Sequence, residues 1–237
     1  MSANAPDHRD APAVQDGLVQ YVGAISRVTR QGVLSASIAL EDLSKDHLYG
    51  VGPVANLRGE ITIVDGCPYI AVLDDSNRPS VSQSFAVGAP FLVYANVAQW
   101  TAPEALKAVA NLNDLERAVE DAAARHGIDL HSAFPFLISG SVLQAKYHII
   151  WRDPDAGPHT PELHAKAKRY FSIADEASDI VGFYSRHHAG VFTHHDSFIH
   201  AHLVNHERSK MGHLDEIAWE AGAAALRLPL APGAAPR

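Results

Sequence analysis

This chain of 237 residues contains 15 histidines, and many of them lie in one part of the sequence. The segment "HDSFIHAHLVNHERSKMGHLDE" includes His200 and His202 on either side of one alanine, and His213 follows further along. If this segment forms a strand, residues two apart project from the same face. We therefore predict that His200 and His202 can hold one metal ion together, at Zn–N distances of about 2.0–2.1 Å.

The position of His213 strengthens this prediction. A hairpin turning near Glu207 and Arg208 would place His213 opposite His202, because their separation has the parity of a cross-strand pair. Opposite residues have Cβ atoms about 4.5–5.5 Å apart. Three neutral nitrogen ligands with an open fourth position are typical of a catalytic zinc site, and other metals that bind imidazole also fit. From spacing alone, a metal site and a histidine-rich surface loop remain alternatives.

Other polar residues carry weaker signals. The adjacent histidine pairs at 187–188 and 194–195 would point apart on a strand, so loop or surface positions are expected for them, and His206 is expected in the turn. Glu60 is a different candidate, because a carboxylate on a strand can ligate a metal or transfer a proton. An isolated glutamate at a strand end is usually only solvated, and the local sequence does not decide its role.

Strand patterns dominate the elements that would position these residues. "LRGEITIVDGCPYIAVLDD" predicts a hairpin with strands at 60–64 and 69–73 and a turn at Asp65-Gly66. Further strand segments are predicted at 85–100 (one long strand or a pair), at 136–151 as a hairpin turning near 139–141, and at 179–186, 196–204 and 212–220.

Helix signals are fewer. Residues 37–45 predict a short helix, and Thr101 to Glu104 form a capping box ahead of a helix that ends at Gly127, with a break near 111–113. Thr160 is a predicted N-cap, with Pro161 at the first helical position. Many strands with two or three helices and no regular βαβ alternation predict an α+β fold.

Composition limits the class of protein. The formal net charge is −8 with no run of Lys or Arg, so we expect no nucleic-acid partner. No long apolar run predicts a membrane span, the N-terminus lacks a signal-peptide pattern, and Cys67 is the only cysteine, so a cytoplasmic protein is expected. We predict one domain at 18–230, between disordered tails at 1–17 and 231–237.

The chain resembles the acetolactate decarboxylases from about Val19 to Pro229. The matching stretches are "VQYVGAISRVTRQGV", "LYGVGPVANLRGEITIVDGCPYIA", "FLISGSVLQAKYHIIWR", "IVGFYSR" and "FIHAHLV…HERSKMGHLDEIAWEAG". The His-x-His with its later histidine, and the Gly-Glu of "LRGEITIVDG", are the most specific of these.

The resemblance implies that His200, His202 and His213 hold Zn²⁺ and that Glu60 lies in the same site. It also implies a mixed sheet with a few helices, a smaller C-terminal β-barrel-like part, a metal site using residues from both β-rich parts, and a homodimer. The implied reaction converts 2-acetolactate, a small oxygenated substrate, to acetoin and carbon dioxide. Zinc would stabilise charge that builds on oxygen as the C–C bond breaks.

Three departures separate this chain from the family. Gap-free alignment from Ile138 puts His148 where the family has a substrate-binding arginine, and Arg152 matches a second basic position. An imidazole lacks the permanent charge and bidentate fork of a guanidinium. The chain also ends without a counterpart of a family C-terminal glutamate. The loop from Ser185 to Ser197 is longer and is expected to bring four histidines and Phe192 near the pocket mouth.

Three functions follow from these residues. The first is a zinc-dependent lyase that decarboxylates a 2-hydroxy-3-oxo acid, with Glu60 and His148 as catalytic residues. The second uses the same zinc for retro-aldol cleavage or hydrolysis, for which an imidazole at 148 is well suited. The third is an inactive metal-binding module, which needs neither Glu60 nor His148.

Overall fold

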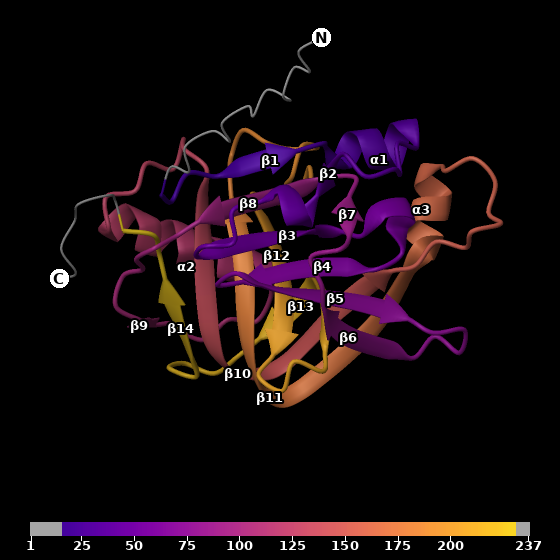
Figure 1. Ribbon diagram of the computed structural model, residues 1–237. Helices are drawn as coiled ribbons and strands as arrows, with labels where there is room; N and C mark the ends of the chain where they lie inside the picture. Colours follow the sequence, from indigo (N-terminus) through magenta and orange to yellow (C-terminus); the bar gives the residue numbers. More distant parts are fainter. Residues whose placement is uncertain (1–15, 231–237) are drawn as a thin grey trace, which may run out of the picture.

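The computed structural model describes residues 16–230, and they form two six-stranded sheets, a two-stranded pairing and three α-helices (Figure 1). The α+β prediction is confirmed. The predicted tails fall outside the described residues, except for Asp16 and Gly17, which form a turn. There the Gly17 N–H donates to the Asn96 carbonyl at 2.7 Å, and the Asp16 carboxylate accepts from the Ala98 N–H at 2.7 Å.

The first sheet has the strand order β1-β8-β3-β4-β5-β6. Its strands are β1 (Gln20–Val22), β8 (Leu92–Asn96), β3 (Leu48–Pro53), β4 (Glu60–Val64), β5 (Cys67–Leu73) and β6 (Pro79–Gln83). The predicted hairpin is confirmed as β4–β5, with Asp65 (φ 46°) and Gly66 (φ 74°) in its turn. Positive φ at both central residues matches the right-handed twist of the flanking strands.

Segment 85–100 contributes two strands that do not pair with each other. β7 (Gly88–Ala89) pairs with β2 (Ile38–Ala39), while β8 pairs with β1 and β3. The helix predicted at 37–45 is wrong for most of its length. Only Leu40–Asp42 is helical, as a 3₁₀ turn that follows β2.

The second sheet has the order β11-β12-β13-β10-β14-β9, and β10 also pairs with β11. Four strands thereby close a ring of pairings, at the place where a barrel-like part is expected. The strands are β9 (Glu104–Ala105), β10 (Phe134–Ile150), β11 (Lys168–Tyr184), β12 (Ile199–Asn205), β13 (Met211–Ala218) and β14 (Ala224–Arg227).

The turn predicted near 139–141 is wrong, because β10 runs straight through it. Ser139, Gly140 and Ser141 pair with Asp179, Ser178 and Ala177 of β11. Gly140 is required by close packing instead, since a Cβ there would lie 2.3 Å from the Ala223 carbonyl oxygen just before β14. The Ser139-Gly140-Ser141 segment, which resembles a turn in sequence, is therefore part of a strand that packs closely against its neighbours.

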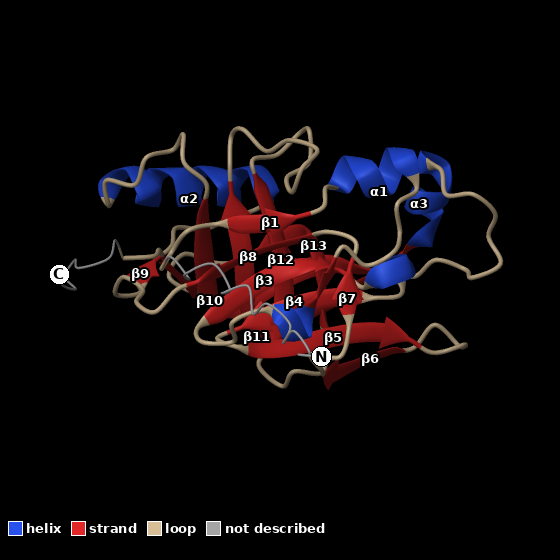
Figure 2. Cartoon of the chain, turned by 45° about the horizontal axis from the view of Figure 1, so that its top comes forward, coloured by secondary structure: helices blue, strands red, loops and turns tan. Residues whose placement is uncertain are grey.

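The helices are α1 (Ile25–Gln31), α2 (Leu112–Arg125) and α3 (Pro161–Ala167), and they lie along one side of the sheets (Figure 2). The α3 prediction is confirmed, with Thr160 Oγ1 accepting from the Leu163 N–H at 3.2 Å. The capping box at Thr101 is wrong, because Glu104 lies in β9. α2 begins instead after Asn111, whose side chain accepts from the Asp114 N–H at 3.0 Å.

The two sheets pack against each other so that β4 of the first lies against β12 and β13 of the second. The largest apolar cluster joins α2, through Leu115 and Val119, to Ile217 of β13 and to Tyr69 of β5. No helix within residues 16–230 is long and apolar enough to cross a bilayer. The seam between β4 and β12 is the place where the candidate site residues meet.

One of the crowded glycines in the ring of strands lies against an aromatic side chain. Gly182 of β11 lies between Phe136 and Ala201, and a Cβ at this position would approach the Phe136 ring to 2.1 Å. Phe136 is fully buried, so we expect Gly182→Ala to lower the free energy of unfolding by about 1–3 kcal/mol. Denaturant unfolding measures this loss. Gly157→Ala, whose Cβ meets nothing within 4 Å, should show no comparable loss.

Candidate metal centre

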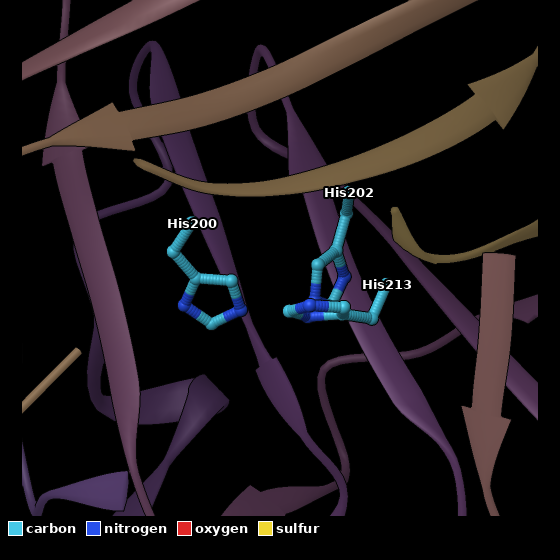
Figure 3. Close-up of side chains that lie close together, drawn as sticks. All are labelled: His200, His202 and His213. Atoms are coloured by element: carbon cyan, nitrogen blue, oxygen red, sulfur yellow. The ribbon is translucent and has the colours of Figure 1, made fainter. Parts of the chain in front are cut away.

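Three histidines converge in the seam between the sheets (Figure 3). His200 and His202 lie on β12, and His213 lies on β13 directly opposite His202 in the antiparallel register. Their ring centroids are 4.9–5.4 Å apart, and one ligand atom from each lies within 4.8 Å of the others. The hairpin and the cross-strand pairing predicted from the sequence are both confirmed.

The imidazoles are held in the neutral form that a metal requires. His200 and His202 are 2% and 0% exposed. Desolvation, helped by the charge of His194, lowers the pKa of His200 to about 3. Desolvation and the neighbouring imidazoles also lower the pKa values of His202 and His213 well below the usual range. Neutral imidazoles offer lone pairs at physiological pH.

Two ring nitrogens in this cluster have no hydrogen-bond partner. Nδ1 of His200 and Nε2 of His202 are both buried and unpaired within the described residues. Leaving a buried polar atom unpaired costs about 1–3 kcal/mol. Nδ1 of His200 lies on the side of its ring away from the other two histidines (Figure 3). The unpaired Nε2 of His202, in a cluster of three neutral imidazoles, fits a bound metal ion, so these residues suit the metal that the family resemblance implies.

Thr62 fixes the orientation of one of the three rings. Its Oγ1 lies 3.0 Å from Nδ1 of His202, and both side chains are fully buried. Thr62 stands two residues after Glu60 on β4, so both side chains project from the same face toward β12. A hydrogen bond to the far nitrogen fixes the ring of a metal-binding histidine and its tautomer. Local sequence gave no reason to select Thr62.

Glu60 lies against the same histidine. It is 3% exposed, its Oε1 accepts from the Ile150 N–H at 3.1 Å, and its Oε2 lies 3.8 Å from Nε2 of His202. Burial raises its pKa well above the ordinary carboxyl value, so a solvated strand-end role is wrong. Gly59 makes this placement possible, because its φ is 138° and a Cβ there would lie 2.2 Å from the Ala71 carbonyl oxygen.

His148 lies beside the triad. It stands opposite His213 in the β10–β13 pairing, with ring centroids 4.6 Å apart, and is 4% exposed. Its Nδ1 bonds the Asp215 carboxylate at 2.7 Å. Burial lowers the pKa of His148, and Asp215 opposes that shift. Asp215 was missed from the sequence, although its position two residues after His213 places it on the same face of β13.

Of the remaining positions considered in the sequence, some lie where they were expected and others do not. His195 lies in the loop, 3.3 Å from an Arg30 nitrogen, and His206 lies in the turn, as expected. Phe192 does not fit the expectation of a residue at the pocket mouth, because its side chain is buried in a core cluster. Arg152 turns toward its own loop, where it donates to the Gly157 carbonyl at 2.7 Å.

His194 joins the site, as expected for a histidine of the 185–197 loop, and His164 joins it without having been selected from the sequence. The His194 ring lies 5.4 Å from that of His213. Both line a cavity of about 40 Å³ together with Glu60, His200 and His213. Of the loop and surface positions expected for His194, the loop position is confirmed and the surface position is wrong, because the His194 ring lies against His213 of β13.

The fold and the histidine cluster together define an α+β protein with a candidate metal site, and comparison with known families shows which family it belongs to. The family model for alpha-acetolactate decarboxylase matches residues 21–228. The chain belongs to this family, whose activity is that of a lyase. A search of curated proteins finds no match.

Solved structures agree on the fold. Alpha-acetolactate decarboxylase from Bacillus subtilis strain 168 is similar with a TM-score of 0.72 and 17% identity, covering 90% of this chain and 86% of that one. A Staphylococcus aureus protein of unknown function, described as similar to alpha-acetolactate decarboxylase, has a TM-score of 0.67 and 16% identity, covering 89% and 85%. At this identity the likeness shows the fold alone.

Removing the Thr62 hydroxyl tests how the His202 ring is held. Thr62→Val keeps the side-chain shape but leaves Nδ1 of His202 without its 3.0 Å partner. We expect zinc affinity, measured by competition with a chromophoric chelator, to fall about 10- to 100-fold. Thr101→Val is the matched control, because it removes a buried hydroxyl that accepts from the Leu228 N–H. Equal affinities in both variants would contradict the assignment.

The histidine in the cavity wall makes folding sensitive to acid. Desolvation first, and then the charge of Lys168, lowers the pKa of His164 to about 3. Between pH 6.5 and 3 the unfolded state binds the extra proton, so the free energy of unfolding falls by up to about 1.4 kcal/mol per pH unit. His164→Asn should remove this contribution, which chemical denaturation at a series of pH values measures. Parallel curves for the two proteins would contradict it.

Proposed function

We propose that this protein is a zinc-dependent carbon–carbon lyase that decarboxylates a 2-hydroxy-3-oxo acid such as 2-acetolactate. The observation that carries the proposal is the convergence of three neutral imidazoles on one point, with a buried carboxyl group beside them. His200, His202 and His213 would hold the ion. When bound, zinc would polarise adjacent substrate oxygens and stabilise the charge that builds on them.

Glu60 is assigned the transfer of a proton at the reacting carbon. One of its oxygens is fixed by the Ile150 N–H, which orients the group, and the other is left facing the triad. Phe91 and Ile150 line the small cavity that this oxygen faces. A substrate that fills this cavity would displace water from it, so a proton delivered there would go to the substrate.

His148 is assigned a second proton-transfer role, with Asp215 as its positioning residue. The Nδ1–Asp215 hydrogen bond orients the ring and sets its tautomer, which leaves Nε2 as the nitrogen for the substrate. This histidine–carboxylate pair also supports the second candidate function, retro-aldol cleavage or hydrolysis at the same metal. Both reactions need a group that transfers a proton more than a group that binds an anion.

The homodimer implied by the family stays a prediction that analytical ultracentrifugation tests.

Metal content and acetoin formation together test the proposal. We expect the purified protein to contain zinc and to form acetoin from 2-acetolactate, and His202→Ala to lose most of both, because it removes a fully buried ligand. Elemental analysis and a colorimetric acetoin assay measure these quantities. Zinc without acetoin would favour the second candidate or an inactive metal-binding module. Unchanged zinc in His202→Ala would refute the ligand assignment.

Asp215→Asn tests the positioning of His148. The amide keeps the shape of the carboxylate but no longer favours one orientation and tautomer of the ring, so we expect kcat to fall about 10- to 100-fold with zinc content unchanged. The neighbouring Glu216→Gln is the control, because that exposed carboxylate pairs with Lys146 at 3.2 Å on the surface. A loss of zinc in Asp215→Asn, or an equal loss of kcat in the control, would contradict the assignment.

A further inference from the structure

A second and larger cavity lies beside the candidate metal centre. It has a volume of about 270 Å³ and lies between α1, α3 and the loop that precedes β12. The loop is fixed to α1 by two backbone hydrogen bonds, from Ile25 N–H to the Val191 carbonyl at 2.8 Å and from Ser26 N–H to the Gly190 carbonyl at 2.9 Å. The wall of the cavity includes Arg30, His164, Lys168, Thr193, His194 and His195.

The cavity shares walls with the metal centre. Ile25, His164 and His194 line both this cavity and the small one that contains Glu60, His200 and His213. A molecule bound at the metal can therefore extend past His164 and His194 into the larger space. That space is far larger than either methyl group of 2-acetolactate requires.

The wall of this cavity is basic, although the chain as a whole carries a net charge of −8. No carboxylate lines it. Within residues 16–230, no carboxylate oxygen lies within 4.0 Å of the side-chain nitrogens of Lys168 or Arg30. Carboxyl groups line its two neighbours: Glu60 lines the small cavity at the metal centre, and Asp196 and Asp215 line a third cavity together with Lys168.

A buried hydroxyl adds a donor that the protein does not use. Thr193 is 0% exposed, lines the cavity, and its Oγ1 has no hydrogen-bond partner among the described residues. Its backbone is fixed by the Gly190 N–H, which donates to the Thr193 carbonyl at 2.8 Å. Two side-chain cations and an unpaired hydroxyl are donors of the kind that bind a carboxylate or phosphate group.

We propose that this cavity binds an oxyanion, either a carboxylate or a phosphate, carried by the substrate at the end remote from the metal. Lys168 is the main cation, Arg30 stands at the rim, and Thr193 donates from within. The assignment of the oxyanion to the substrate rests on the proposed function, whereas the anion site itself does not. With this assignment, the substrate carries a second anionic group and is larger than 2-acetolactate.

Anion binding by the intact protein tests the site directly. Inorganic phosphate and malonate are the two probes, titrated calorimetrically at constant ionic strength in chloride buffer. We expect saturable binding of at least one, weakened about tenfold or more by Lys168→Gln, because a hydrogen bond to a charged group contributes about 1.5–3 kcal/mol. Thr193→Val should weaken it several-fold. Lys107→Gln, which removes an exposed lysine outside the cavity, should bind as the wild type does.

His202→Ala separates the cavity from the metal, since both probes also bind zinc. Binding that survives in His202→Ala and is weakened by Lys168→Gln supports the proposal. Binding lost in His202→Ala, equal binding by Lys168→Gln and Lys107→Gln, or no saturable binding of either probe overturns it. If Lys168→Gln does not fold, Arg30→Gln at the exposed rim takes its place in the same comparison.

Kinetics distinguish a substrate group from a free anion. If the oxyanion belongs to the substrate, the bound probe inhibits turnover competitively, and Lys168→Gln raises KM more than it lowers kcat. Non-competitive inhibition would overturn the substrate assignment. Absence of turnover on 2-acetolactate with zinc and anion binding intact refutes only the acetolactate reaction and leaves the site in place.

Discussion

Burying three imidazoles and a carboxyl group in one seam is the constraint on which the rest of the structure depends. Desolvation by burial keeps each imidazole neutral, and two ring nitrogens remain unpaired. Two unpaired buried nitrogens cost on the order of 2–6 kcal/mol together. Structural zinc sites contribute about 10 kcal/mol or more, so one bound ion would offset that cost. Thr62 and the Ile150 N–H hold the polar groups in place from two directions.

The roof of the site is built differently from its floor. Strands β4, β12 and β13 supply the floor, where register fixes which side chains face one another. The roof is a loop whose shape no ladder dictates, and α1 determines it by donating the Ile25 and Ser26 N–H groups to the loop carbonyls of Val191 and Gly190. Its own Thr193 and His194 then face inward. A short helix that packs no large core of its own thus acts mainly by positioning the residues that surround the metal centre.

Strand parity was sufficient to predict the triad, because His200, His202 and His213 lie on two consecutive strands joined by a short turn. It was insufficient for Thr62, His164 and Lys168, which reach the same site from distant segments, where only tertiary packing sets the distance. The same limit explains the errors in secondary structure. The capping box at Thr101 is locally sound, yet the Leu106 N–H is taken by the Ala224 carbonyl, and pairing with β14 outweighs a helix start.

The resemblance places His148 at the position of a family arginine, and the position of Lys168 gives this expected exchange a physical meaning. His148 of β10 pairs with Tyr170 of β11, and Lys168 lies two residues before that partner, opposite Ile150. The charge of Lys168 also contributes to the lowered pKa of His148. A fixed cation next to this imidazole disfavours a second charge there. Under the proposed function, β10 would carry a neutral proton carrier at the position that the resemblance assigns to a family cation, and β11 would carry the charge. Holding an anion and moving a proton would then be separate tasks, and a substrate with two anionic groups would use both.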